Sequence, residues 1–251
     1  MHRCRVSPQD LLRDLVRLPP DAAHHLAHVL RAGPGTRIQL FDGRGGIARG
    51  EIQTVSVDGV EVRVSDRDRE PDADGTPRVV LLQALPKGRI MDWIVEKATE
   101  IGVDMVIPVV ADRSVCRPDE GRAGARVGRW GRIAEAATRQ CGAAFVPEVT
   151  PLYALEEALV AAGSLDLLLV CSVTAGAVPL GQVLGDRLSA AWAVGVMIGP
   201  EGDWSPAEVS AALRRGGVPV SLGRRVLRVE TAALYALSAL ACAAASHGAA
   251  V

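Results

Sequence analysis

The chain has 251 residues, of which 49% are hydrophobic and 23% charged, a composition typical of a globular protein with one or two domains. Its formal net charge of −1 excludes a general electrostatic attraction to nucleic acid, so binding of that kind would need a local basic patch. The five cysteines lie far apart, without the paired spacing of a zinc site or a disulfide framework. We therefore expect no metal and a reducing, cytoplasmic location.

The N-terminal part has the alternating pattern of β-strands. Strands are predicted over residues 37–41, 51–57 and 60–64, with a turn at Asp58–Gly59 and a short helix over 22–30. Residues 43–48 fit the dinucleotide-loop pattern G-x-G-x-x-A, but a strand pattern follows where that motif needs a helix, so we predict a hairpin loop. The charged segment 65–77 contains proline and glycine and predicts a linker. The domains are therefore predicted as a small β-barrel over 1–72 and a second domain over 78–251.

Strands and helices alternate after the linker. Apolar runs predict strands over 79–85, 105–110, 165–171, 193–198 and 218–221, and helical spacing predicts helices over 89–101 and 125–140. The alternation indicates an α/β domain with a mostly parallel sheet. The uncharged stretch 231–246 is short for a membrane span and rich in alanine, so we expect a buried helix and no membrane partner.

Two glycine-bearing loops follow apolar runs near the C-terminus. They occupy residues 198–208 and 222–232, and each opens into a helical pattern. In the first loop, Ser205, Pro206 and Glu208 have the spacing of a helix-capping box, so we assign them no chemistry. A tight strand–helix turn would explain one such loop. Two of them at strand ends favour a small-molecule cleft built from main-chain groups.

Basic residues gather in three places. Arg224, Arg225 and Arg228 precede the last helix, where positive charge opposes the helix dipole, and we expect Arg228 to bind an anionic substrate group. Residues 112–139 hold seven arginines and four acids. This stretch is either a solvated helix face with Trp130 in the core or a surface that follows phosphates. The third cluster fits an edge that faces a polyanion and comprises Arg3, Arg5, His24, His25, His28 and Arg31.

Four groups of residues together resemble one known family. They are His25-x-x-x-Val29-Leu30-Arg31 with Phe41–Gly43; Ala84–Lys87 with Met91–Gly102; Gln140–Gly142 with Val146–Glu148; and the two C-terminal loops. In this order they are similar to the RsmE family of 16S ribosomal RNA methyltransferases, within the SPOUT superfamily. The resemblance spans nearly the whole chain.

The resemblance implies an architecture and an activity. It implies an N-terminal PUA-like β-barrel and a C-terminal SPOUT α/β domain that ends in a trefoil knot. It implies a homodimer that uses S-adenosyl-L-methionine to methylate N3 of a uridine in 16S ribosomal RNA or the small ribosomal subunit. Two alternatives stay open: a non-catalytic RNA-binding protein of the same fold, and a methyltransferase that acts on another RNA.

The resemblance also assigns site residues. The cofactor residues are expected to be Cys171, Ser172, Val173, Ile198, Gly199, Pro200, Glu201, Gly202, Ser221, Leu222, Gly223, Val226, Leu227 and Arg228. The catalytic candidates are Arg228, to stabilise negative charge on the uracil, and Glu201 or Glu230, as the base. The expected RNA contacts are Arg3, Arg5, His25, Arg31, Lys87 and Arg113.

Four positions depart from the family pattern. Ala143 stands where arginine is frequent, which predicts one fewer RNA contact. Asp203 stands where a second glycine is common and is expected to change the flexibility of its loop. Val229 replaces a usual threonine, and His28 replaces a frequent basic residue.

Overall fold

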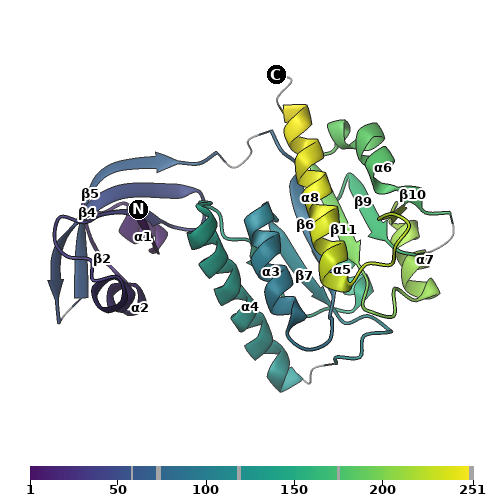
Figure 1. Ribbon diagram of the computed structural model, residues 1–251, viewed down its shortest axis with the longest axis horizontal. Helices are drawn as coiled ribbons and strands as arrows, with labels where there is room; N and C mark the ends of the chain where they lie inside the picture. The colour runs from purple at the N-terminus through teal and green to yellow at the C-terminus, as the bar shows by residue number, and fades with distance from the viewer. Residues whose placement is uncertain (58, 72–74, 118–119, 174–175, 249–251) are drawn as a thin grey trace. The chain divides into compact units, whose positions relative to one another are not determined.

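The computed structural model describes all residues except 58, 72–74, 118–119, 174–175 and 249–251. The chain divides into two compact units (Figure 1). The first contains Met1–Asp74 and Thr138–Val146, and the second contains Gly75–Ala137 and Pro147–Val251. The predicted ranges 1–72 and 78–251 do not include the return of residues 138–146 to the first unit. Asp58, in the predicted turn, lies outside the described residues.

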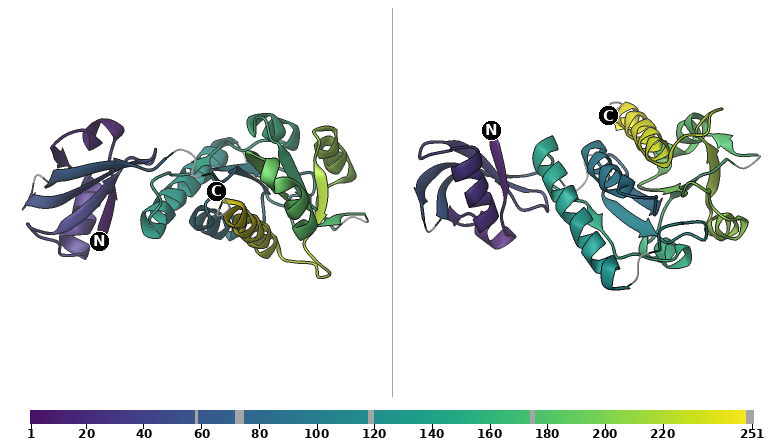
Figure 2. Two further views of the ribbon diagram at one scale, coloured as in Figure 1. Left: turned by 90° about the horizontal axis from the view of Figure 1, so that it is seen from above. Right: turned by 60° about the horizontal axis from the view of Figure 1, so that its bottom comes forward.

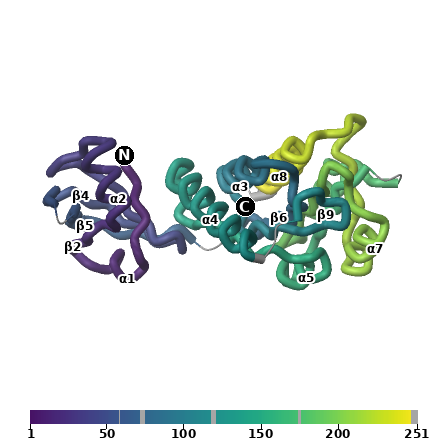
Figure 3. The backbone as a smooth tube through the Cα atoms, turned by 90° about the horizontal axis from the view of Figure 1, so that it is seen from below, coloured from purple at the N-terminus to yellow at the C-terminus, as the bar shows by residue number. Residues whose placement is uncertain are grey.

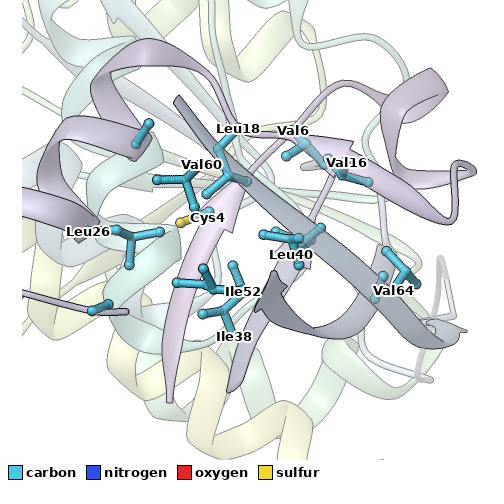
Figure 4. Close-up of a cluster of buried hydrophobic side chains, with 14 of the residues drawn as sticks. Cys4, Val6, Val16, Leu18, Leu26, Ile38, Leu40, Ile52, Val60 and Val64 are labelled. Atoms are coloured by element: carbon cyan, nitrogen blue, oxygen red, sulfur yellow. The ribbon is translucent and has the colours of Figure 1, made fainter. Parts of the chain in front are cut away.

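A five-stranded mixed sheet forms the first unit, in the order β1-β3-β4-β5-β2. The strands are β1 His2–Arg5, β2 Leu15–Arg17, β3 Arg37–Phe41, β4 Gly46–Ser56 and β5 Gly59–Arg69. Only β1 and β3 pair in parallel. The helical segments are α1 Pro8–Leu11, α2 Pro20–His24 and the π-helical turn η1 His25–Val29. One face of each strand supplies buried aliphatic side chains, such as Ile38, Leu40 and Ile52 (Figure 4).

The hairpin of β4 and β5 includes part of the segment 65–77, which was predicted to be a linker. Residues 65–69 belong to β5 and pair with β4 as far as Gly46, so the linker interpretation was wrong there. Residues 65–69 of β5 are exposed and carry alternating charges, and Asp66 forms an ion pair with Arg49 of β4 across the strands. Charge therefore concealed a paired strand. The glycine pattern at 43–48 is a hairpin connection, as predicted, since β3 ends at Phe41 and β4 begins at Gly46.

The return segment 138–146 is bound to the first unit by specific contacts. The Arg3 guanidinium donates to the carbonyls of Thr138 at 3.2 Å and Ala143 at 2.9 Å, and it lies 4.8 Å from the centre of the Phe41 ring. The Ala144 amide donates to the Glu70 carboxylate at 3.1 Å. The Gln140–Gly142 motif therefore lies on the N-terminal unit, although the sequence around it belongs to the second.

A seven-stranded parallel sheet forms the second unit, in the order β10-β12-β9-β11-β6-β7-β8. Its strands are β6 Arg78–Ala84, β7 Met105–Val109, β8 Glu148–Val149, β9 Leu167–Cys171, β10 Val178–Pro179, β11 Ala193–Ile198 and β12 Val218–Ser221. The helical segments are α3 Ile90–Ile101, α4 Glu120–Cys141, α5 Leu155–Ala161, α6 Leu180–Arg187, η2 Leu188–Ala190, α7 Pro206–Arg214 and α8 Val229–Gly248. The predicted α/β class and the five longer strands are confirmed.

Helices cover both faces of this sheet. Figures 2 and 3 show α3 and α8 together on one face, with α5 and α7 on the other. Side chains of α5 and α7 form a buried cluster with alternate residues of β6 and β7, such as Val80, Leu82 and Ile107. The predicted buried helix is α8, but only 33% of Val229–Ser246 is buried, with a mean hydropathy of 1.4. By length and composition α8 could cross a membrane, a test that core helices of globular proteins also pass.

Candidate cofactor and RNA site

Three adjacent strands end at the same edge of the parallel sheet. β9 lies between β12 and β11, and these strands end at Cys171, Ser221 and Ile198. The carboxyl ends of neighbouring parallel strands are where α/β proteins bind small molecules. The loops after the three strands therefore converge on one place.

The loop after β11 is a tight turn that favours glycine at its start. The Asp203 amide donates to the Pro200 carbonyl at 2.9 Å and closes the turn. A Cβ at Gly199 would lie 3.1 Å from Asp203 Oδ1 and 3.2 Å from the Trp204 amide nitrogen, closer than ordinary contact. The capping box is confirmed, because Ser205 Oγ accepts from the Glu208 amide at 3.2 Å and the Glu208 carboxylate accepts from the Ser205 amide at 2.8 Å.

The loop after β12 carries the three arginines into α8. Gly223 has a φ of 115°, a left-handed conformation that favours glycine. Arg224, Arg225 and Arg228 are exposed. In the part of the chain that the structure describes, none of their guanidinium groups makes an ion pair or a hydrogen bond. Unpaired guanidinium groups beside a cleft are suited to bind an anion.

A cavity of about 430 Å³ opens between the three loops. This is the size of a typical small-molecule site. The lining residues come from all three loops and from the start of α8: Cys171, Ser172, Val173, Gly176, Ala177, Ile198, Gly199, Pro200, Glu201, Asp203, Ser221, Leu222, Gly223, Arg224, Arg225, Val226, Leu227, Val229 and Ala232.

The cavity brings together nearly all of the residues predicted for the cofactor. Only Gly202 and Arg228 are not part of the lining. Gly202 faces Arg113, whose Cβ would lie 3.2 Å from a Cβ built on that glycine. Arg228 stands in the sequence between the lining residues Leu227 and Val229. Glu230 is half-buried in the first turn of α8.

Two residues that are expected to contact RNA also donate hydrogen bonds to the loop after β11. The Lys87 amide donates to Glu201 Oε1 at 2.9 Å, so the Glu201 carboxylate already has a loop-ordering bond. Arg113 Nη1 donates to the Gly202 carbonyl at 2.9 Å. The Lys87 side chain is exposed.

The remaining RNA candidates lie in the first unit. Arg5, His25 and Arg31 are exposed, whereas the Arg3 guanidinium is engaged with carbonyls and its burial lowers the pKa of Arg3. The engagement of Arg3 gives it a structural role that its sequence position does not indicate. The rings of His24 and His28 lie 4.7 Å apart in the same cluster.

The stretch 112–139 combines core and surface residues. Trp130 is buried, as one of the two interpretations requires, and its Nε1 donates to Asp92 at 3.1 Å. Arg129 pairs with the same carboxylate at 2.8 Å. Arg126 donates to Cys116 Sγ at 2.8 Å. Most of these arginines therefore have intramolecular partners.

Asp203 is a residue whose position in the cavity the sequence interpretation missed. Its carboxylate accepts from Ser172 Oγ at 2.9 Å and from the Val173 amide at 3.1 Å, which joins two of the three loops. Burial raises the pKa of the neighbouring Cys171 thiol to about 12, and the Asp203 charge contributes. The only signal in the sequence was an acid at a position where a flexible residue is common.

Two family models match this sequence. The family model described as an RNA methyltransferase domain matches residues 74–241, and the one described as an RNA methyltransferase PUA domain matches 18–65. The fold and cavity therefore define the class as RNA methyltransferases that carry a PUA domain.

Relatives narrow this class. The ribosomal RNA small subunit methyltransferase E of Bacillus subtilis is 33% identical over 88% of this chain and 87% of its own. The enzyme of that name from Neisseria gonorrhoeae, solved bound to S-adenosyl methionine, is 31% identical over 96% of each chain, with a TM-score of 0.82. A putative methyltransferase from Legionella pneumophila, solved with its cofactor SAM, is 30% identical over 96% of this chain and 97% of its own, with a TM-score of 0.84. The chain belongs to the ribosomal RNA small subunit methyltransferase E family, which the sequence resemblance indicated.

Proposed function

We propose that the protein transfers a methyl group from S-adenosyl-L-methionine to N3 of a uridine in 16S ribosomal RNA. The observation that carries this proposal is the cavity formed by the loops after β9, β11 and β12. Two relatives with about the same fold over 96% of this chain were solved with the same cofactor. The substrate follows from the name that the relatives share.

The lining residues fit such a cofactor. Main-chain groups of Gly199–Glu201 and Ser221–Gly223 offer hydrogen bonds to its polar atoms, and Val226 and Leu227 offer apolar surface. The bound cofactor supplies a methyl group on a positively charged sulfur. In the transfer the S–CH₃ bond breaks and the N3–CH₃ bond forms, while the N3 proton must leave to a base.

Arg228 is proposed to stabilise the negative charge that builds on the uracil oxygens as N3 loses its proton. Its guanidinium is exposed and unpaired within the described residues, and its neighbours in the sequence, Leu227 and Val229, line the cavity. Of the two candidate bases, Glu201 already accepts from the Lys87 amide, whereas no such bond engages Glu230 in the described part of the chain. This difference favours Glu230 as the proton acceptor. The target base must also be accessible outside a helix or flipped out.

The finer architecture is also a proposal. We infer that the five-stranded sheet of the first unit closes as a PUA-like barrel that helps bind RNA. The chain leaves β11, passes β9 and forms β12 on its other side before α8, an order that supports a C-terminal trefoil knot. We further propose that the enzyme works in the cytoplasm, where its ribosomal RNA substrate would be. We propose a homodimer because α8 is apolar and largely uncovered.

The Arg228→Ala variant tests the proposed function. We expect it to lose methylation of small-subunit RNA by about 10²–10³-fold, the effect of removing a group that stabilises developing charge. Its fold should be intact, since Arg228 is exposed. The measurement is mass analysis of ribosomal RNA after incubation with purified protein and cofactor.

Arg214→Ala is the matched control, because Arg214, on α7, forms within the described residues only an exposed ion pair, with Glu156 of α5. Wild-type turnover by Arg228→Ala would remove Arg228 from the mechanism. Absence of calorimetric binding of S-adenosyl-L-methionine by the folded wild type would contradict the proposed function and favour a non-catalytic RNA-binding protein. Methylation of a different RNA alone would leave the chemistry but change the substrate.

A further inference from the structure

Asp203 has a backbone conformation that residues with a Cβ rarely adopt. Its φ is 60°, and among the described residues only Arg31 shares a positive φ without being glycine. Aspartate tolerates this region better than most residues but is still less favourable there than glycine. Such a conformation persists where the surrounding contacts impose it, and functional sites are where this usually occurs.

The Asp203 carboxylate makes three hydrogen bonds that account for this conformation. Oδ2 accepts from Ser172 Oγ at 2.9 Å and from the Val173 amide at 3.1 Å, both in the loop after β9. Oδ1 accepts from the Trp204 amide at 2.8 Å, in the loop after β11. β9 and β11 are neighbours in the sheet (Figure 1). Both loops line the cavity. One side chain therefore connects two walls of the site.

The site is built around this carboxylate. The missing side chain at Gly199 leaves room for Oδ1, which would lie 3.1 Å from a Cβ there. Hydrogen bonds to an ionised carboxylate are stronger than those between neutral groups. Asp203 itself is half-buried and lines the cavity. The hydrogen bonds of Asp203 therefore lie at the cavity wall, where a change in loop position alters the shape of the binding site.

We propose that Asp203 is a positioning residue of the cofactor site, which holds the loops 171–173 and 199–204 in their binding arrangement before the cofactor arrives. This inference rests on the proposed function. Loops that are already ordered do not have to be ordered on binding, and a preorganised site binds its ligand more tightly for that reason. Asp203 acts through the two loops, and its effect belongs to cofactor affinity.

The chain offers a matched control at the opposite edge of the same sheet. Asp166 Oδ2 accepts from the Trp192 and Ala193 amides, both at 2.9 Å. These bonds connect the amino ends of β9 and β11 as the Asp203 bonds connect their carboxyl ends. Asp166 does not line the cavity. Substitution of Asp166 should therefore affect stability without affecting the cofactor.

The experiment compares Asp203→Gly, Ser172→Ala, their double variant and Asp166→Asn. For each full-length protein, calorimetry measures the Kd for S-adenosyl-L-methionine, and a thermal scan measures the Tm. Asp203→Gly should raise the Kd about tenfold, the equivalent of one charge-assisted hydrogen bond. Its Tm should fall only slightly, because glycine relieves the unfavourable φ and so offsets part of the loss of the three hydrogen bonds. Asp166→Asn should lower the Tm and leave the Kd unchanged.

Two further measurements separate positioning from a general structural role. The double variant should lose less binding free energy than the sum of the losses in Asp203→Gly and Ser172→Ala, because both substitutions remove the same contact. In kinetics, Asp203→Gly should raise the KM for the cofactor while the KM for RNA stays the same. A structural role alone would change both KM values together with the Tm.

The outcomes are distinct. A wild type that binds no cofactor contradicts the proposed function itself. A wild type that binds, with Asp203→Gly binding equally well, overturns only the inference about Asp203. Loss of affinity in both Asp203→Gly and Asp166→Asn, in proportion to their loss of Tm, also overturns it.

Discussion

Arginine has two different uses in this chain, and only the structure separates them. Arg3 and Arg228 both lie in basic segments that the sequence assigned to RNA or substrate. The Arg3 guanidinium instead binds carbonyls more than 100 residues away, whereas Arg228 stays exposed and unpaired within the described residues. Charge can be read from a sequence, but the distant carbonyls that satisfy it cannot. Arg228 is therefore the stronger candidate for a ligand contact.

Two buried cysteine thiols should make the free energy of unfolding depend on pH. Burial raises the pKa of Cys171 from 9.0 to about 12 and that of Cys4 from 9.0 to about 11. In the unfolded chain these thiols ionise above pH 9, while in the folded protein they stay protonated. Their contribution to stability is thus fully present below pH 9 and is lost as the pH rises toward 11 and 12.

The measurement is urea unfolding at pH 8 and pH 10 under reducing conditions. The wild-type loss between these values should include about 1.4 kcal/mol from Cys171, the equivalent of one pH unit. Cys171→Ala should lack this part of the loss. Cys242→Ala should keep it, because Cys242 is exposed. Equal pH dependence in the two variants would contradict the buried state of the Cys171 thiol.

At the scale of elements, the carboxylate of Asp92 connects α3 with α4. Asp92 on α3 accepts from Arg129 at 2.8 Å and from Trp130 Nε1 at 3.1 Å. Because Trp130 is buried, Asp92→Ala would leave its N–H without a partner. We expect a loss of about 1–3 kcal/mol in the free energy of unfolding, the cost of an unsatisfied buried donor. Chemical denaturation measures this loss.

Glu156→Ala is the control for Asp92→Ala. Glu156 pairs with Arg214 at 3.3 Å, and both side chains are exposed. Exposed pairs of this kind contribute about 0–1 kcal/mol. If the two variants lose the same free energy, the bond from Asp92 to Trp130 does not stabilise the contact between the helices.

Elements with a strong local signal could be predicted from the sequence. The capping box at Ser205 involves residues three apart, and the strand 193–198 is a continuous, largely buried apolar run. Elements defined by distant partners could not. β1 pairs with β3, which lies more than 30 residues later, and the charged end of β5 is a strand only because β4 pairs with it. The cavity was predictable because its loops follow recognisable strands.

At the scale of the whole molecule, the chain enters its first unit twice. Residues 138–146 comprise the last residues of α4 and the segment after it, and they belong to the first unit. The chain then continues into β8 in the second unit. The linker pattern at 65–77 gave no sign of this return, because the contacts depend on Arg3 and Glu70, which are distant in sequence. The two units are thus connected by the chain at three places, before Gly75, after Ala137 and before Pro147.

The helix α8 has more apolar surface than its own unit covers. Its residues 231–246 carry no charge, only 33% of Val229–Ser246 is buried, and Tyr235 is 51% exposed. Trp93 on the adjoining helix α3 is 42% exposed. Exposed apolar surface of this extent marks an interaction site. A second copy of the chain would cover it in the proposed homodimer.

Light scattering in solution tests the homodimer, with an expected mass of twice the 26.3 kDa chain. Tyr235→Glu should shift the protein to the single-chain mass, because a charge at the centre of an apolar interface is left without a partner. Leu213→Glu, on the exposed surface of α7, should leave the dimer intact. A single-chain mass for the wild type, together with flotation on lipid vesicles, would show that a membrane covers α8 instead. The same vesicle assay on a dimeric wild type should show no binding, because the dimer buries the apolar face that a membrane would need.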